Sequence, residues 1–165
     1  MANTSLLTPE PTGSAAGSDE VDHARISRQL RQHPEFEHGA GADESAIRAA
    51  EAHLGVKFPA AYRRFLSDFG WGFFADFEIC GLGTDVPVWM DVVKVTQMER
   101  GNGMLALPVH LLPIHAEGDG DQVCIDLRGT AGLAAPVVFW DHSAGSGQTP
   151  TLLAGDFLNW LADLL

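Results

Sequence analysis

The sequence predicts a single α+β domain, in which N-terminal helices and a C-terminal helix flank a mixed, mostly antiparallel sheet of about five or six strands. Apolar residues recur at helical spacing as far as Gly70. Short apolar runs separated by Gly and Asp follow, and helical spacing returns at the C-terminus. The length of 165 residues and the hydrophobic fraction of 45% fit one globular domain.

The N-terminus is predicted to be a flexible tail over residues 1–18, because Thr, Ser, Pro, Gly and Ala dominate it. Residues 19–165 are then the folded domain. Its first predicted helix covers residues 19–32 and stops before Pro34, which cannot continue a helix. Three apolar residues share one side of this helix: Val21, Ile26 and Leu30.

Two short helices are predicted back to back between Asp43 and Gly70. Asp43 is placed to cap the first helix, and Gly55 stands where a helix commonly ends in a left-handed residue. Pro59 fits the first turn of the second helix. The stripe of the first helix is Ile47, Ala50, Glu51 and Leu54, and that of the second is Tyr62, Phe65, Leu66 and Phe69. We expect the aromatic face of the second helix to pack on a sheet.

The sheet is predicted from four segments. Residues 73–79 alternate as a half-buried strand does. Three further strands are expected at residues 111–115, 122–127 and 136–140, separated by turn-forming Gly and Asp. Residues 91–100 fit either a strand or a helix. A final helix is predicted to pack through Phe157, Leu161 and Leu164.

The cysteines and the N-terminus bear on cellular location. Cys80 and Cys124 show no metal-type or redox-type spacing, so we expect two thiols, with one disulfide as the alternative. The first eighteen residues hold no Lys or Arg, and no stretch reaches the ~20 apolar residues of a spanning helix. We therefore expect a cytoplasmic protein without membrane contact.

Charge is unevenly distributed along the chain. The formal net charge is -12, and residues 75–165 hold twelve acidic residues against three basic ones. A solvated acidic face would account for this. The alternative is a docking surface for a basic partner, since an acidic field repels nucleic-acid phosphates and steers basic proteins. Direct nucleic-acid binding is therefore not expected.

The candidate partner-binding residues are carboxylates that could pair with Lys or Arg, and tryptophans that could anchor an interface. The carboxylates are Asp76, Glu78, Asp85, Glu117, Asp119, Asp121 and Asp141. Trp71 and Trp89 lie outside the clear core stripes and could be anchors or lids on the core. Trp140 and Trp160 fall inside predicted elements and are assigned to the core.

Several His and Asp residues raise the alternative of a metal site or a hydrolase: His110, His115, Asp119, Asp121, Asp141 and His142. The sequence lacks a His-Glu-x-x-His motif, and the segment 118–121 lacks the remaining ligands of a calcium loop. A tight turn also selects Asp and Gly. We therefore predict no enzyme, cofactor or metal, and keep a metal-dependent hydrolase using His115, Asp119 and His142 as a remote alternative.

One segment resembles the opening signature of the SUKH superfamily in its Smi/Knr branch. It reads Glu-Ala-His-Leu-Gly-Val-Lys-Phe-Pro-Ala-Ala-Tyr-Arg-Arg-Phe-Leu over residues 51–66, with Phe58 where the family pattern usually has Leu. Residues 112–127 are similar to the central strand pair of the family. Residues 136–142 and 157–161 resemble its closing strand and terminal helix. The resemblance covers roughly residues 40–165 and favours a helix over residues 91–100.

Many bacterial members of that family are immunity proteins, which bind and neutralise a toxin. The resemblance therefore implies a stoichiometric inhibitor, and the acidic second half favours a basic toxin such as a nuclease, blocked by occlusion. The alternative that the resemblance implies is a regulatory scaffold that binds several cellular proteins. The sequence does not determine the oligomeric state.

Overall fold

The chain folds into helices and strands that follow the predicted α+β order. The structure is a computed structural model that describes residues 15–74, 76–128, 135–145 and 147–165. The helices are α1 (Ala15–Gln32), α2 (Glu44–Leu54), α3 (Ala60–Phe69), α4 (Val92–Arg100) and α5 (Phe157–Asp163). The strands are β1 (Glu37–His38), β2 (Gly72–Phe74), β3 (Phe77–Ile79), β4 (Leu111–Ala116), β5 (Gln122–Asp126), β6 (Val137–Trp140) and β7 (Thr151–Ala154). Two 3-10 turns, η1 (Gly103–Leu105) and η2 (His142–Ala144), complete the described elements.

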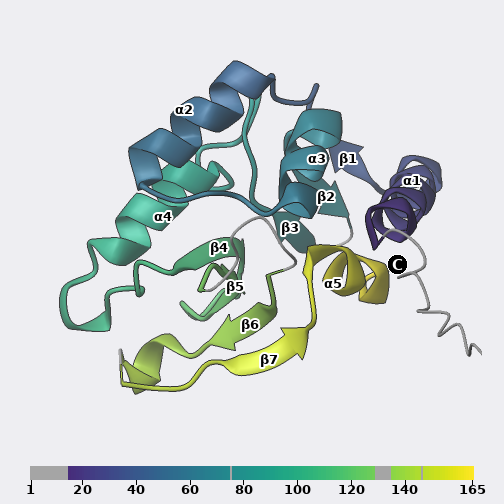
Figure 1. Cartoon of the computed structure of the whole chain (residues 1–165). Coiled ribbons are helices and arrows are strands. Elements are labelled where there is room, and N and C mark those ends of the chain that lie inside the picture. Colours follow the sequence, from purple (N-terminus) through teal and green to yellow (C-terminus); the bar gives the residue numbers. More distant parts are fainter. Residues whose placement is uncertain (1–14, 75, 129–134, 146) are drawn as a thin grey trace, which may run out of the picture.

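The strands form two antiparallel sheets instead of the single sheet that was predicted. One has the order β1-β2-β3 and the other the order β4-β5-β6-β7. They meet where β3 passes beside β4, and the Cys80 N–H donates to the Ile114 carbonyl over 2.7 Å. Figure 1 shows α2, α3 and α4 on one side of the molecule and the four-stranded sheet on the other, with α1 and α5 at one end.

The caps of the predicted helix pair are confirmed. The carboxylate of Asp43 accepts from the Ala46 N–H over 2.8 Å, and Gly55 ends α2 with a left-handed φ of 68°. Pro59 is the residue before α3 rather than its first residue. Residues 91–100 form a helix, because the Asp91 carboxylate caps the N–H groups of Val93 and Lys94.

The main core lies between the helices and the two sheets. The aromatic face of α3 is buried as predicted, and Tyr62 donates its hydroxyl to the Cys80 carbonyl over 2.7 Å. Phe157 and Trp160 of α5 pack against it, while Trp140 belongs to a smaller cluster on the other face of the four-stranded sheet. Ile26 and Leu30 of α1 are buried, and the side chain of Val21 lies outside the described ones. The core assignments of Trp140 and Trp160 are confirmed.

Three local predictions differ from the structure. The strand expected over residues 73–79 is a hairpin, because Phe74 pairs directly with Phe77. Strands β1 and β7 were not predicted. Helix α1 begins at Ala15, earlier than the predicted residue 19, and residues 1–14 of the predicted tail lie outside the described residues.

Both cysteines are thiols, as expected. Cys80 and Cys124 are free and buried, and burial raises the pKa of the Cys80 thiol to about 12. Within the described ranges, no helix is long and apolar enough to span a membrane.

Candidate functional site

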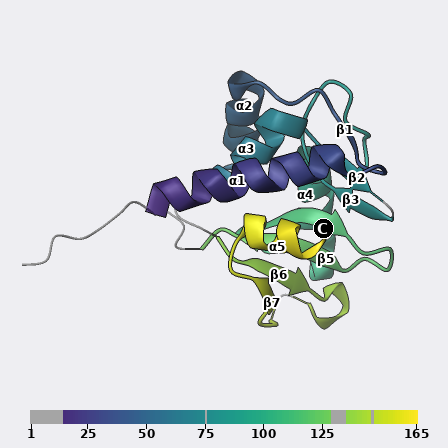
Figure 2. The same ribbon diagram turned by 90° about the vertical axis from the view of Figure 1, so that its right-hand side faces the viewer.

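Six of the seven predicted carboxylates lie along one edge of the molecule, which we call the acidic edge. They belong to the β2–β3 turn, to β3, to the β4–β5 turn and to the segment after β6: Asp76, Glu78, Glu117, Asp119, Asp121 and Asp141. Figure 2 shows these turns stacked along the right-hand side of the view. Strand β3 passes beside β4, where His115 donates from Nδ1 to the Glu78 carbonyl over 2.8 Å, and hydrogen bonds between Asp121 and His142 join the β4–β5 turn to the segment after β6.

The β4–β5 turn holds three of these carboxylates through backbone geometry. Glu117 donates its N–H to the Asp121 carbonyl over 2.9 Å, and the Asp119 carboxylate accepts from the Asp121 N–H over 3.2 Å. Gly120 has φ 104°, and a Cβ there would lie 3.1 Å from the His142 ring. The prediction that Asp and Gly serve a tight turn is confirmed. Glu117 and Asp119 are left exposed.

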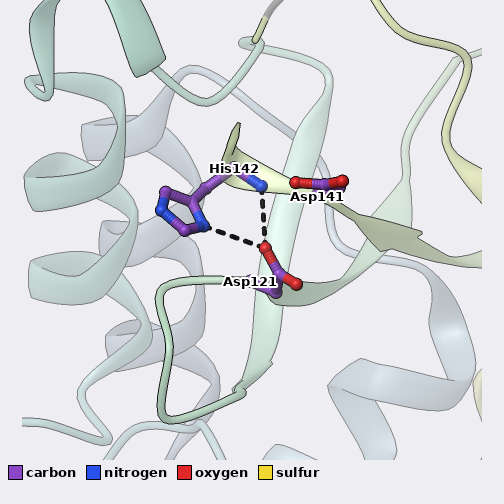
Figure 3. Close-up of side chains that lie close together, drawn as sticks. All are labelled: Asp121, Asp141 and His142. Atoms are coloured by element: carbon purple, nitrogen blue, oxygen red, sulfur yellow. Dashed lines mark hydrogen bonds and ion pairs between the residues drawn. The ribbon is translucent and has the colours of Figure 1, made fainter. Parts of the chain in front are cut away.

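Asp121 joins this turn to the segment after β6. Its Oδ1 accepts from both the backbone N–H and the Nδ1–H of His142, each over 2.9 Å (Figure 3). The hydrogen bond with Asp121 raises the pKa of His142 above its ordinary value of 6.5. The His142 ring is therefore the positive group nearest to this part of the acidic edge at weakly acid pH.

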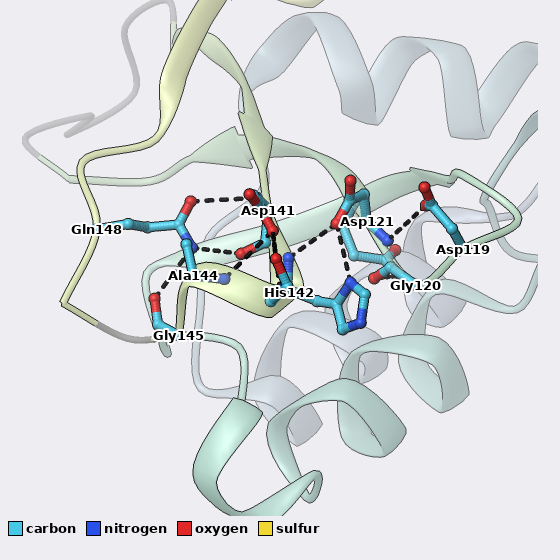
Figure 4. A network of polar contacts seen from close by, with 10 residues as sticks. Asp119, Gly120, Asp121, Asp141, His142, Ala144, Gly145 and Gln148 are labelled. Atoms are coloured by element: carbon cyan, nitrogen blue, oxygen red, sulfur yellow. Dashed lines mark hydrogen bonds and ion pairs between the residues drawn. The ribbon is translucent and has the colours of Figure 1, made fainter.

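Asp141 caps the η2 turn next to His142. Its Oδ1 accepts from the Ser143 hydroxyl, the Ser143 N–H and the Ala144 N–H. These hydrogen bonds lower the pKa of Asp141, and the one from the Ser143 hydroxyl contributes most. Gln148 brackets the turn: it donates to the Asp141 and Gly145 carbonyls and accepts from the Asp141 N–H (Figure 4). The loop is therefore fixed by its own polar groups.

Metal ligation is the chemistry that the three side chains of Figure 3 could offer. Ligand atoms of Asp121, Asp141 and His142 lie within 4.8 Å of one another, and all three residues are half-buried. Each of these side chains already makes hydrogen bonds that hold the turns. The trio of the alternative hydrolase hypothesis, His115, Asp119 and His142, is not among the groups of possible ligands in the described residues, and His115 is buried with its ring stacked on Phe77 at 3.8 Å.

Trp89 lies on the acidic edge. Its Nε1–H donates to the Glu78 Oε1 over 3.0 Å, and 62% of its surface is exposed. The His115 that holds the Glu78 carbonyl has its Nε2 at 3.7 Å from the Glu117 carboxylate. Glu78 thus contacts Trp89 through its carboxylate and the buried His115 through its carbonyl, and His115 in turn lies beside Glu117.

Trp71 and Asp85 form a separate pair. Trp71 donates from Nε1 to the Asp85 carboxylate over 3.3 Å, and its ring is half-buried against Gly39. The Trp71 ring therefore lies against Gly39, next to the start of β2. Of the nine residues predicted for partner binding, these two are the ones that the structure does not bring to the acidic edge.

The carboxylates of the acidic edge differ from the buried carboxylate of α2 in their ion-pair partners. In the parts of the chain that the structure describes, no Lys or Arg forms an ion pair with any of the six, and their ion-pair contacts are with His115 and His142. The opposite holds around α2. There Glu51 is buried and pairs with Arg63 at 2.6 Å and Lys57 at 3.3 Å.

A pocket of about 720 Å³ opens beside that Glu51 pair and is separate from the acidic edge. Its lining mixes charged groups, such as Arg48 and Lys57, with apolar ones, such as Val109 and Leu127. None of the nine residues predicted for partner binding lines it, whereas His110, one of the candidate metal ligands, does. The helical stripe had indicated that Glu51 faces the core, but nothing local indicated the His142–Asp121 contact, which spans 21 residues.

Comparison with known proteins identifies relatives of this fold. The family model SUKH_5, described as SMI1-KNR4 cell-wall, matches residues 24–165. A crystal structure of a protein from Pseudomonas syringae pv. tomato is similar, with a TM-score of 0.64 at 20% sequence identity, over 86% of this chain and 96% of that one. No curated protein sequence matches the chain.

Proposed function

Because this chain belongs to the SMI1-KNR4 family of the SUKH superfamily, we propose that it is an immunity protein that neutralises a basic protein toxin through its acidic edge. The toxin would be a nuclease or a similarly basic enzyme. Inhibition is by occlusion: the edge covers the cationic surface that the toxin needs for its substrate. The chain itself performs no reaction in this proposal, and it acts in the compartment where the toxin acts, the cytoplasm.

The observation that carries the proposal is the set of carboxylates without Lys or Arg partners. Asp76, Glu117 and Asp119 are exposed, and no Lys or Arg of the described ranges forms an ion pair with them. Like charges held together raise the local negative potential, which accelerates association with a basic protein. The same potential opposes nucleic-acid binding, because phosphates carry the same sign.

The turns around these carboxylates also favour binding. Hydrogen bonds from His142 and within the η2 turn fix Asp121 and Asp141 before any partner arrives. A surface that is already ordered loses less conformational entropy on association. The edge is therefore suited to a tight complex of one chain with one toxin.

The test is capture of the product of the reading frame next to this protein's own gene. The proposal predicts a one-to-one complex that weakens as salt is raised and that abolishes the toxicity of the partner. A matched pair of variants assigns the binding surface: Asp76→Asn with Asp119→Asn on the edge, and Asp22→Asn with Asp163→Asn on α1 and α5. All four aspartates are exposed, so both variants change the net charge equally. Equal loss of binding in the two variants would contradict the proposal.

A second candidate is a regulatory scaffold, which the cell-wall description of the matching family favours. A scaffold would retain several unrelated cellular proteins in the same capture experiment. The adjacent reading frame would not encode a toxin, and the chain would not protect cells. That result would replace the immunity proposal.

A further inference from the structure

Trp89 is an aromatic side chain that the fold holds outside its core. It is the one aromatic residue among the large hydrophobic side chains that are exposed in the described part of the chain. Both faces of an indole attract cations, and the attraction strengthens when water is displaced. The surroundings of Trp89 therefore determine which ligand it suits.

The position of Trp89 is fixed from both sides along the chain. The next residue, Met90, is buried, and its N–H donates to the Pro87 carbonyl over 2.9 Å. The Met90 carbonyl accepts from the Gly81 N–H over 2.8 Å, and Asp91 caps α4. The indole is thus attached to a stretch of backbone that two elements hold in place.

Glu78 fixes the indole ring itself. Its Oε1 accepts from the Trp89 Nε1–H over 3.0 Å, while its backbone carbonyl accepts from His115. No Lys or Arg of the described residues pairs with the Glu78 carboxylate, and Glu117 lies on the other side of His115. An exposed indole and a carboxylate without a Lys or Arg partner among the described residues therefore stand side by side in a negative field.

We propose that Trp89 and Glu78 form a receptor for a single arginine side chain of the partner. The guanidinium stacks on the indole face and donates to the Glu78 carboxylate, with Glu117 adding to the attraction. A planar guanidinium suits this pair better than an ammonium, because it stacks on aromatic rings, is more weakly hydrated and presents directed N–H groups. The inference rests on the proposed function, since it names the chemistry by which the acidic edge recognises a basic protein.

The test needs no toxin. The indole N–H signals of the four tryptophans are followed by NMR while the full chain is titrated with acetyl-Arg-Arg-Arg-amide, and separately with acetyl-Lys-Lys-Lys-amide. We expect a saturable shift of the Trp89 signal with the arginine peptide, and affinity for the lysine peptide lower by about threefold. Equal affinities, or a shift centred on another tryptophan, would overturn the proposal.

Four variants separate the site from general charge attraction. Trp89→Leu and Glu78→Gln should each remove the preference for the arginine peptide, whereas Trp71→Phe should retain it. Trp89→Phe keeps a ring and should retain part of it. If all four variants preferred arginine to the same extent, the receptor would be elsewhere.

Failure of the arginine receptor can be distinguished from failure of the proposed function. A captured toxin whose affinity is unchanged by Trp89→Leu would overturn this receptor and leave the immunity proposal standing. Arginine-selective binding at Trp89 without any toxin partner would support the receptor and contradict the immunity proposal.

Discussion

The region around α2 and the acidic edge both carry carboxylates, but the chain treats them in opposite ways. Glu51 is 2% exposed and is surrounded by donors: Arg63 at 2.6 Å, the Phe58 N–H at 2.8 Å and Lys57 at 3.3 Å. The six carboxylates of the acidic edge receive no Lys or Arg from the described residues. The difference indicates that Glu51 stabilises the fold, whereas the exposed Asp76, Glu117 and Asp119 are not neutralised by Lys or Arg of the described residues.

The ion pairs and hydrogen bonds of Glu51 also explain the opening segment of the family pattern in physical terms. Glu51 lies on α2, Phe58 in the connection, and Arg63 on α3, so one carboxylate joins three consecutive parts of the chain. Burial alone would raise the pKa of Glu51, but the hydrogen bonds from Arg63 and the Phe58 N–H outweigh it, and the pKa is lowered. The helix pair is therefore fixed by a charge that remains ionised.

Glu51→Gln should have the largest effect on stability. We expect a loss of about 2 kcal/mol in the free energy of unfolding at neutral pH, because the buried carboxylate gives up its charged hydrogen bonds with Arg63, which keeps only Glu44 as a partner. The measurement is urea unfolding, with the exposed Glu35→Gln as a control that should change stability by about 0.5 kcal/mol or less.

The pH dependence of that effect follows from the lowered pKa of Glu51. A carboxyl whose folded pKa lies below its ordinary 4.5 stabilises the protein above that value, and the stabilisation is lost as the pH falls through the folded pKa. The difference in the free energy of unfolding between the wild type and Glu51→Gln should therefore become smaller in acid. A difference that stayed constant through this range would contradict the role of the charge.

Neutralising the acidic edge should leave stability nearly unchanged. Asp76→Asn with Asp119→Asn should shift the free energy of unfolding by about 0.5 kcal/mol or less, and at low salt in the stabilising direction, because like-charge repulsion is relieved. Thermal unfolding at low and high salt checks this against the Asp22→Asn and Asp163→Asn pair. A marked loss of stability would mean that the edge is structural and would remove the contrast with Glu51.

The smallest effect is expected at His142, the cation that the chain does provide to the edge. Since the folded pKa of His142 is raised, its contribution to stability is fully present below 6.5 and is lost as the pH rises through the folded pKa. His142→Gln should therefore lower the melting temperature in weak acid and have no such effect in alkali. NMR titration of the ring should give a pKa above 6.5 in the wild type and a lower one in Asp121→Asn.

Local chemistry made the helical half predictable from the sequence. Asp43 and Gly55 act on backbone groups a few residues away, so the bounds of α2 could be inferred without tertiary information. The hairpin of β2 and β3 was missed because alternating Phe73, Phe77 and Ile79 imitate one strand across a tight turn. Strand β7 was missed because its pairing with β6, including a register shift, decides its conformation.

The acidic edge could be predicted only in part. The excess of carboxylates is visible in the sequence, and six of the seven predicted carboxylates fall in the β2–β3 turn, β3, the β4–β5 turn and the segment after β6. The sequence did not distinguish Trp89 from Trp71, because each indole is placed by a carboxylate across a loop, at Glu78 and at Asp85 respectively. Such contacts depend on how β3 and β4 align, which no local pattern encodes.

The most direct test of the account is the salt dependence of binding between the purified chain and its captured toxin. The dissociation constant is measured over a salt series for the wild type, the Asp76→Asn and Asp119→Asn double variant, and the Asp22→Asn and Asp163→Asn control. We predict that the edge variant weakens binding by about fivefold at low salt and flattens the salt dependence, while the control matches the wild type. Identical curves for both variants would contradict the claim that the uncompensated edge is the binding surface.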